Sequence, residues 1–327
     1  MKIKTIAQDR TKIGFIGIGA MGLRIAGRLL KQGFCVTAFD RNVEKVNALA
    51  NSGGIPASSI ADLASSVDVV MSSLPNDAAV MGVYSGPEGV LEHIRPGSLI
   101  IEMSTVNPET ARELYRLGLD RRVNVLDVPV SGSTPAAEQG LLTLLGGGDQ
   151  ECFNSAKPIF AAVGRQYFHL GPSGSGATMK LVVNTLLGVG MQAIAEAIVL
   201  GEKAGLNRQR IFDVLAKTAV IAPAHVGKLT KALKHDYRPE FAVGLMNKDF
   251  RLILETAFAV RAPMPTARAA FPINDAEFAN HPDYDFSAVI ERMEAMANIN
   301  SARIDSPAET ISPTKFQESA LNPDERP

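Results

Sequence analysis

Several features common in secreted and metal-binding proteins are missing from this chain. Its 327 residues include only two cysteines, Cys35 and Cys152, and no tryptophan. Two cysteines cannot build a disulfide scaffold, and Cys35 is predicted to lie in a buried strand, so a reducing compartment is expected. The five histidines show no ligand spacing and no cysteine cluster accompanies them, so no metal site is predicted. We expect His225 and His235 on solvated helix surfaces.

The chain also lacks an excess of charge of either sign. Its 33 Lys and Arg residues are balanced by 34 Asp and Glu residues, for a net charge of −1. Without a basic block, neither nucleic acid nor an anionic membrane is an expected partner. Residues 1–12 contain no hydrophobic stretch of the kind found in secretion signals, so a cytoplasmic protein is expected. The 46% hydrophobic residues suffice for two cores, which predicts two domains.

Residues 1–170 alternate between strand and helix patterns. Their strands are short, continuous and rich in β-branched residues, which is typical of a parallel sheet covered by helices on both faces. The expected strands are 13–16, 35–39, 68–74, 98–103 and 123–127, and runs at 141–145 and 166–170 are expected to extend the sheet. This region therefore predicts an α/β fold with a doubly wound parallel sheet.

The first expected strand leads into a glycine-rich turn. The pattern GxGxxG follows a strand, opens a helix and is answered by an acid 18 residues after its third glycine. In this context it indicates a Rossmann-type dinucleotide site, in which the glycines permit a tight turn, close approach of the pyrophosphate and close helix–sheet packing. The helix N-terminus adds N–H groups that attract phosphates. The residues assigned to the cofactor here are Gly17, Gly19, Ala20, Met21 and Gly22.

The charge beside the ribose distinguishes the two nicotinamide dinucleotides. Asp40 follows the second strand, where its carboxylate can accept hydrogen bonds from the ribose hydroxyls and would repel a 2′-phosphate. NAD is therefore favoured as the cofactor. Arg41, directly after it, could instead contact a 2′-phosphate, so NADP remains an alternative.

Ligands of an open parallel sheet bind beyond the carboxyl ends of its strands. Leu74, Pro75 and Asn76 follow the third of these strands, so all three are assigned to the cofactor site. The first two could alternatively serve only to end the strand. Thr105 follows the next strand. Because a proline begins the helix after it, Asn107 is expected to cap that helix, which leaves Thr105 for a ligand.

A further loop follows the fifth strand, in the segment Asp127–Gly140. It combines small residues, hydroxyl groups and backbone N–H groups, which suit an anion such as a carboxylate. Ser131, Gly132 and Ser133 are assigned to substrate binding. On its own the segment is equally compatible with an ordinary turn.

Residues 171–300 have a different character, since strand patterns disappear and helical periods predominate. They predict an all-α domain for substrate binding and oligomerisation. The expected helices are 173–204, 208–217, 224–233, 244–261, 267–280 and 287–297. The first is more apolar than one small domain needs to bury, so we expect a homodimer or homotetramer packed through the helical halves. Residues 301–327, rich in proline and polar residues, are predicted to be disordered.

Inside the first of these helices, Lys180 and Asn184 stand one turn apart. Continuing by fours adds Gly188, Gln192 and Glu196, which makes one narrow polar stripe on an apolar helix. Burying an unpaired ammonium is costly, so Lys180 must face a wet cleft or a partner. The solvated face of an ordinary helix is the alternative interpretation.

Four motifs, taken together in this order, resemble the β-hydroxyacid dehydrogenase family, which includes 3-hydroxyisobutyrate dehydrogenase and tartronate semialdehyde reductase. The motifs are Gly17–Gly22, Asp127–Gly132, Gly171–Asn184 and Lys-Asp-Phe-Arg-Leu at 248–252. The resemblance covers about residues 12–297. It implies an oxidoreductase that transfers a hydride between NAD(P) and a small 3-hydroxy acid or its semialdehyde.

The resemblance also implies roles for individual residues. Lys180 matches the catalytic acid/base and Asn184 the residue that holds the substrate, while Ser131 and Gly132 match the residues that bind its carboxylate. Burial is expected to lower the pKa of Lys180 toward working pH. The residues that the resemblance places along the cofactor are Leu74, Pro75, Thr105 and Lys248.

Two alternatives stay open at this point. Family members usually read Ser-Gly-Gly in the carboxylate loop, whereas Ser133 replaces the second glycine here, so the substrate is left open. An NADPH-dependent reductase of glyoxylate, succinic semialdehyde or tartronate semialdehyde is the alternative enzyme, and Arg41 supports it. A non-catalytic dinucleotide-binding module is the alternative of another class. An ammonium such as that of Lys180 in the cleft argues against it.

Overall fold

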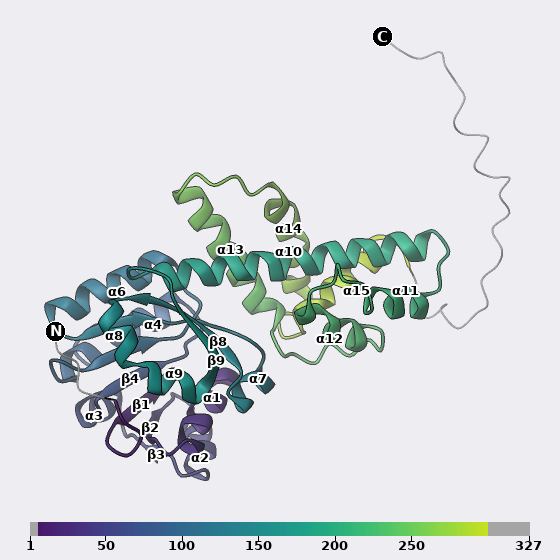
Figure 1. Cartoon of the computed structure of the whole chain (residues 1–327). Helices are drawn as coiled ribbons and strands as arrows, with labels where there is room; N and C mark the ends of the chain where they lie inside the picture. Colours follow the sequence, from purple (N-terminus) through teal and green to yellow (C-terminus); the bar gives the residue numbers. More distant parts are fainter. Residues whose placement is uncertain (1–5, 300–327) are drawn as a thin grey trace, which may run out of the picture.

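A computed structural model describes residues 6–299 of the chain, and the tail predicted at 301–327 lies outside them. A sheet covered by helices occupies one part of the molecule and helices alone the other, with the long helix α10 running between them (Figure 1). The elements of the sheet part are β1 (Lys12–Ile16), α1 (Ala20–Lys31), β2 (Cys35–Phe39), α2 (Val43–Ala50), β3 (Ile55–Pro56), α3 (Ile60–Ser66), β4 (Val69–Ser72), α4 (Asp77–Tyr84), α5 (Val90–His93), β5 (Leu99–Glu102), α6 (Pro108–Asp120), β6 (Asn124–Asp127), β7 (Val130–Ser131), α7 (Thr134–Gln139), β8 (Leu142–Gly148), α8 (Gln150–Ser155), α9 (Lys157–Val163) and β9 (Gly164–His169). The elements of the helical part are α10 (Ser175–Lys203), α11 (Arg208–Leu215), α12 (Pro223–Ala232), α13 (Val243–Ala259), α14 (Pro265–Asn280), the 3₁₀-helix η1 (Phe286–Ala288) and α15 (Val289–Met296).

The strand order shows where ligands can bind. The strands follow the order β3-β2-β1-β4-β5-β6-β8-β7, and β9 pairs with β8. From β3 to β6 all pairs are parallel, and the order reverses at β1, which has β2 on one side and β4 on the other. In such a sheet the ligand crevice lies beyond the carboxyl ends of the strands at this reversal. The predicted doubly wound sheet is confirmed.

The runs expected to extend the sheet do so, but β8 is not parallel to its neighbour. It runs antiparallel to β6, with Leu126 opposite Gly148 and Asp127 opposite Gly147. The chain turns back after α7 at Gly140, which has a left-handed φ of 71°. A short return of this kind produces an antiparallel neighbour, because parallel pairing requires a long crossover. The crossover through α8 and α9 then makes β9 parallel to β8.

Alternate residues of the parallel strands enter two hydrophobic clusters. Phe15 and Met71 belong to the cluster formed with α1, α2, α8 and α9, whereas Val70 and Ile100 belong to the one formed with α3, α4 and α6. Because successive side chains of a strand point to opposite faces, burial on both faces requires continuous apolar runs. The helical part has its own cluster, centred on α10 and α13.

Asparagine caps set several helix starts in the sheet part. The side chain of Asn107 accepts a hydrogen bond from the N–H of Glu109, and Pro108 is the first residue of α6. The predicted cap is thereby confirmed. Asn76 caps α4 in the same way, through the N–H of Ala79. Such caps satisfy N–H groups that the helix itself leaves without partners.

Two expectations about burial are wrong. Cys35 is exposed, because it is the first residue of β2 and precedes the first buried position of that strand. His225 is buried rather than solvated: its Nε2 lies 2.9 Å from the carbonyl oxygen of Leu187 on α10, and Gly190 leaves room for the ring. A polar side chain that is hydrogen-bonded can be buried at little cost. His235 is exposed, as predicted.

Helix α10 is long and apolar enough to cross a membrane by length and composition alone. In this structure it packs against β8, α13, α14 and α15, and Figure 1 shows it extending from the sheet to the far end of the helical part. Three large apolar side chains on it are nevertheless exposed, namely Val182, Leu186 and Leu200.

Candidate active site

The glycine turn between β1 and α1 has the shape that a pyrophosphate requires. Gly17 has a left-handed φ of 90°, and a Cβ there would lie 2.4 Å from the carbonyl oxygen of Ser73. A Cβ on Gly22 would lie 1.9 Å from the carbonyl oxygen of Gly17. A Cβ on Gly19 would meet no atom within 4 Å, so the space in front of this residue is open. The residues present therefore fit a dinucleotide phosphate group.

The start of α1 is left without a side-chain cap. Gly19 occupies the cap position and contributes no side-chain hydrogen bond. Ala20 and Met21 form the first turn, in which backbone N–H groups have no partner inside the helix. These N–H groups and the positive end of the helix dipole suit an anion.

Asp40 lies beside this turn and helps to hold it. Its Oδ2 accepts a hydrogen bond from the N–H of Ile18 at 2.7 Å, and its Oδ1 accepts one from the N–H of Asn42 at 2.8 Å. The carboxylate thus connects the end of β2 with the middle of the glycine motif. Arg41 is exposed next to it.

The loops after β4 and β5 contact each other. The N–H of Leu74 donates to the hydroxyl of Ser104 at 2.7 Å. Pro75 and Asn76 are exposed beyond it, and the side chain of Asn76 is engaged in capping α4. Thr105 is partly buried, and its carbonyl oxygen accepts a hydrogen bond described below.

The predicted carboxylate loop lies at the start of α10. Ser131 ends β7, Gly132 has a φ of 142°, and Ser133 precedes α7. Gly132 and Ser133 are exposed, and α10 contacts β6, β7 and β8. The structure therefore brings this loop to the helix that carries Lys180.

A buried carboxylate fixes the first turn of α10. Asp127, the last residue of β6, accepts hydrogen bonds from the N–H groups of Gly174 and Ala177, both at 2.9 Å. A Cβ on Gly176 would lie 2.3 Å from the carbonyl oxygen of Leu145, so the helix packs closely on the strands. Asp127 therefore acts as an N-cap from a distant part of the sequence, and it sets the position of Lys180 relative to the sheet.

Asn184 is held by an acid from the neighbouring helix. Its Nδ2 donates to Oδ2 of Asp249 on α13 at 2.5 Å, across 65 residues of sequence. Both side chains are buried. Within residues 6–299, Oδ1 of Asn184 has no hydrogen-bond partner. The arrangement leaves one amide oxygen as an acceptor beside Lys180.

Lys248 connects the helical part with the cofactor loops. Its Nζ donates to the carbonyl oxygen of Thr105 at 2.5 Å and lies 3.0 Å from Oδ1 of Asp249. One chain of polar contacts therefore leads from the loop after β5 through Lys248 and Asp249 to Asn184. Lys248 thus reaches the loop after β5, and its assignment to the cofactor stays a prediction.

Lys180 is the ionisable group at the centre of this arrangement. Burial lowers the pKa of its ammonium, and the charge of Lys248 also lowers it, whereas Asp249 raises it. In the part of the chain that the structure describes, the ammonium makes no hydrogen bond and no close ion pair. It is therefore available to a substrate and loses its proton more readily than an exposed lysine.

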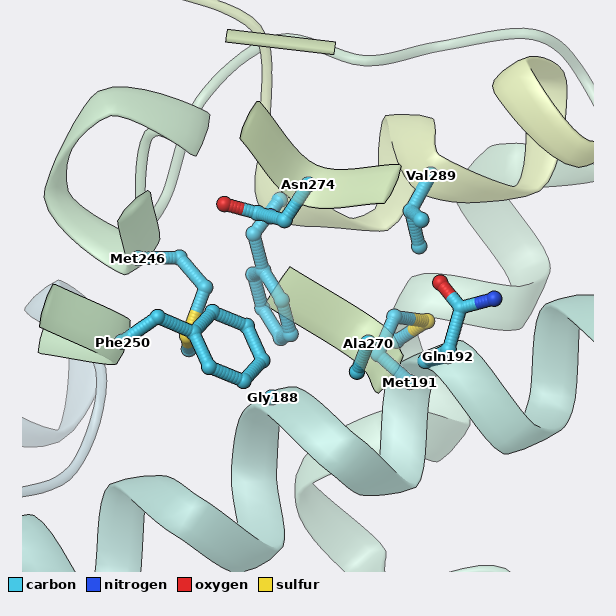
Figure 2. A pocket seen from close by; sticks show the side chains of 9 residues that line it. Gly188, Met191, Gln192, Met246, Phe250, Ala270, Asn274 and Val289 are labelled. Carbon is cyan, nitrogen blue, oxygen red and sulfur yellow. The ribbon is translucent and has the colours of Figure 1, made fainter. Parts of the chain in front are cut away.

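Beyond Asn184, the next two residues of the polar stripe of α10 face the interior of the helical part. Gly188 faces α13, where a Cβ would lie 2.7 Å from the ring of Phe250. Farther along, Gln192 lines a small pocket inside the helical part, and Asn274 from α14 lies across from it (Figure 2). Oε1 of Gln192 and Oδ1 of Asn274 have no hydrogen-bond partner among the described residues. Asn184, Gly188 and Gln192 are buried, which contradicts the alternative of a solvated helix face, and only Glu196 at the end of the stripe is exposed.

Some residues of the site were not identified from the sequence. Asp249 was part of a motif, but nothing showed that it would meet Asn184, since the two are far apart in the chain. Asp127 was recognised only as the start of a loop. Asp127 and Glu102 each end an apolar strand. An acid in that position could have been recognised from the sequence, because the carboxyl end of a parallel strand lies at the edge where ligands bind.

The fold and these features together define a two-part dinucleotide-binding oxidoreductase. Residues 12–171 match the family model described as the NAD binding domain of 6-phosphogluconate dehydrogenase. Residues 174–293 match the model described as NAD-binding of NADP-dependent 3-hydroxyisobutyrate dehydrogenase.

Individual relatives agree with these models. The 2-(hydroxymethyl)glutarate dehydrogenase of Eubacterium barkeri is 35% identical over 88% of this chain and 97% of that protein. Glyoxylate/succinic semialdehyde reductase 1 of Arabidopsis thaliana is 35% identical over 86% of this chain and 98% of that protein. A solved structure of Mycobacterium tuberculosis 3-hydroxyisobutyrate dehydrogenase with L-serine is 33% identical, with a TM-score of 0.79 over 86% of this chain and 98% of that chain.

The chain therefore belongs to the β-hydroxyacid dehydrogenases of the 3-hydroxyisobutyrate dehydrogenase type, as its motifs predicted. It is an oxidoreductase with a nicotinamide dinucleotide cofactor.

Proposed function

We propose that the protein interconverts a small 3-hydroxy acid and its semialdehyde, with Lys180 as the acid/base. The observation that carries this proposal is the Lys180 ammonium, which has a lowered pKa and no hydrogen bond within residues 6–299, beside the oriented amide of Asn184. A bound nicotinamide dinucleotide supplies the hydride acceptor for oxidation or the hydride donor for reduction.

Lys180 handles the proton of the reacting oxygen. In its neutral form the amine accepts the proton of the substrate hydroxyl during oxidation, and in its charged form it donates a proton to the aldehyde oxygen during reduction. The lowered pKa makes the neutral form more accessible at working pH. The Oδ1 atom of Asn184 accepts a hydrogen bond from the substrate, because Asp249 fixes the opposite side of the amide.

The substrate's carboxylate is assigned to the loop at the start of α10. Ser131 contributes a hydroxyl, Gly132 contributes a backbone without a side chain, and Ser133 adds a second hydroxyl. The additional hydroxyl favours a substrate with a polar group near its carboxylate. L-serine and similar β-hydroxy acids are therefore included among the substrates to be tested.

Asp40, the residue expected beside the adenosine ribose, favours NAD as the cofactor. The Asp40 carboxylate is held in place by two backbone N–H groups, so its negative charge cannot easily move away from a 2′-phosphate. The exposed Arg41 is the feature that supports NADP. The ratio of the kcat/KM values for the two dinucleotides measures which of the two residues dominates.

The proposal is tested by following reduced-nicotinamide absorbance with NAD and NADP against small 3-hydroxy acids, and with NADH and NADPH against semialdehydes and glyoxylate. Turnover of a 3-hydroxy acid supports the proposal, whereas turnover of glyoxylate or succinic semialdehyde alone with NADPH supports the alternative reductase. Tight dinucleotide binding without turnover of any compound would favour the non-catalytic module.

We also propose that the protein is a cytoplasmic homodimer or homotetramer. The support is the exposed apolar face of α10, on which Leu186 and Leu200 are each 72% exposed and Val182 is 51% exposed. The test is the molar mass by light scattering, for the wild type and for Leu186→Glu. A monomeric wild type would contradict this proposal. A lower molar mass for the variant than for the wild type would support this face of α10 as the interface between subunits.

A further inference from the structure

A buried carboxyl group lies beneath the loops that follow β4 and β5. Glu102, the last residue of β5, is 1% exposed. Its Oε1 accepts the N–H of Ser104 at 2.6 Å, and its Oε2 accepts the hydroxyl of Ser72, the last residue of β4. The hydroxyl of Ser104 in turn accepts the N–H of Leu74 at 2.7 Å. One carboxylate therefore fixes the start of both loops.

These loops form one side of the expected dinucleotide site. They carry Leu74 and Thr105, and Thr105 also accepts the hydrogen bond from Lys248 that connects the two parts of the molecule. Glu102 itself is too deeply buried to touch a ligand. Any effect that it has on the cofactor must act through the position of the loops.

We propose that Glu102 is a positioning residue of the dinucleotide site, which as a carboxylate holds the loops after β4 and β5 in the binding conformation and which weakens dinucleotide binding when it is protonated. The proposal rests on the proposed function in one respect, namely that these loops contact the cofactor.

The hydrogen bonds around Glu102 are all satisfied when it is ionised. Ser72 lies between Glu102 and Tyr84, whose hydroxyl is 2.6 Å from Oγ of Ser72. With an ionised carboxylate, Tyr84 donates to Ser72 and Ser72 donates to Glu102, so each group is satisfied. A protonated carboxyl that donates to Ser72 leaves either the Ser72 proton or the buried Tyr84 proton without an acceptor among residues 6–299, and a proton on Oε1 weakens the hydrogen bond from the N–H of Ser104. Protonation therefore disturbs the anchor.

The ionisation of Glu102 falls in an accessible pH range. Burial raises the pKa of Glu102 to about 7, although the hydrogen bonds from Ser104 and Ser72 lower it. Two other titratable groups face it, Tyr84 from α4 and Asp127 from the neighbouring strand β6. Burial raises the pKa of Tyr84 well above its usual value, so this phenol stays neutral. The charge of Asp127 further raises the pKa of Glu102.

The experiment is a fluorescence titration with NADH, repeated with NADPH, at a series of pH values from about 6 to about 8. For the wild type we expect affinity to fall by about tenfold as the pH is lowered, the scale of one lost hydrogen bond to a charged group. Glu102→Gln resembles the protonated form, so its affinity should be low and nearly independent of pH. Glu277→Gln is the matched control, because Glu277 is also buried with a raised pKa but lies on α14 in the helical part, and it should behave as the wild type.

A second variant tests the ionisation itself and is informative even if Glu102→Gln does not fold. Ser72→Ala removes a hydrogen bond that lowers the pKa of Glu102, so the midpoint of the affinity profile should move to higher pH. A purely structural role would leave the midpoint unchanged. Unaltered affinity in folded Glu102→Gln, or an unmoved midpoint in Ser72→Ala, overturns the proposal. A wild type that binds neither dinucleotide overturns the cofactor assignment as well, which distinguishes the two failures.

Discussion

The sheet part and the helical part build their sides of the site from different materials. On the sheet side the elements assigned to the dinucleotide phosphates and nicotinamide are mainly backbone, namely the turn at Gly17–Gly22 and the loops after β4 and β5. On the helical side they are the side chains of Lys180 and Asn184 on α10, and Asp249 can hold Asn184 only because α10 and α13 pack together. A site built from backbone depends on shape, whereas one built from side chains depends on charge and protonation. Substitutions on the two sides should therefore fail in different ways.

The largest effect is expected on the helical side. Lys180→Met keeps the length of the side chain and removes the amine, so kcat should fall by about 10²–10⁴-fold, the usual contribution of general acid–base catalysis. Dinucleotide affinity should be nearly unchanged, because the cofactor is assigned to the sheet side. Steady-state kinetics and a fluorescence titration measure the two quantities.

Lys203→Met is the control for this variant, since Lys203 is an exposed lysine at the end of the same helix. It should leave both quantities unaltered. A Lys180→Met enzyme that keeps most of its kcat would show that another group moves the proton.

The glycine turn of the sheet side should respond to shape alone. Gly22→Ala adds a Cβ 1.9 Å from a backbone oxygen that cannot move cheaply, so the free energy of unfolding should drop by roughly 2–4 kcal/mol and dinucleotide binding should be lost. Gly19→Ala meets no protein atom within 4 Å, so it should fold normally but bind the dinucleotide poorly. Thermal unfolding and dinucleotide titration separate the two outcomes.

Gly27→Ala on the same helix is the matched control. Its Cβ also meets nothing within 4 Å, and replacing a helical glycine with alanine stabilises by about 0.5–1 kcal/mol. If Gly19→Ala bound the dinucleotide as well as Gly27→Ala does, the assignment of the turn would be refuted.

The same comparison explains what could be predicted from the sequence. The sheet side is encoded locally: Gly17, Gly19 and Gly22 sit in one turn, and Asn107 precedes the proline that starts α6. Because ligands bind beyond the carboxyl ends of parallel strands, the doubly wound sheet and the loops at these ends could be predicted, but the order of the strands was not predicted. The antiparallel direction of β8 could not be predicted, because it depends on where the chain turns after α7.

The helical side is encoded in contacts between distant residues. The spacing of Lys180 and Asn184 indicated a polar site, but the acid that orients Asn184 comes from 65 residues away. The burial of His225 likewise depends on Gly190 of another helix, which leaves space for the ring. Periodicity identifies helices, but it does not determine which helices pack together or which polar groups they pair.

Glu102 is a side-chain anchor on the backbone-built side, and its charge should be visible in stability. Its pKa is raised from about 4.5 in the unfolded chain to about 7, so the unfolded state ionises first as pH rises. The free energy of unfolding should therefore fall between about pH 4.5 and about pH 7, by roughly 3 kcal/mol from this group, and level off above. Glu102→Gln should lack this component, which chemical denaturation at several pH values measures. An identical pH dependence in the two proteins would rule out the raised pKa.

The smallest effect should come from the charge that orients Asn184. Asp249→Asn removes a negative charge that raises the pKa of Lys180, so the pH at which oxidation accelerates should move lower. The shift is toward lower pH because oxidation needs neutral Lys180, and without the charge of Asp249 the ammonium loses its proton more easily. The loss of a charged partner for Asn184 should also reduce kcat/KM by about tenfold.

Asp275→Asn is the matched control for Asp249→Asn, because Asp275 accepts the amide of Asn247 at 2.9 Å in the same helical part but lies on the surface. Its pH–rate profile should equal that of the wild type. A shift of the Asp249→Asn profile to higher pH would contradict the effect assigned to Asp249, and no shift at all would mean that the pKa of Lys180 is set by burial without Asp249. The pKa of Lys180 would then depend on how tightly the helices pack, as the glycine turn depends on shape. In that case charge would not distinguish the helical side from the sheet side in the reactivity of Lys180.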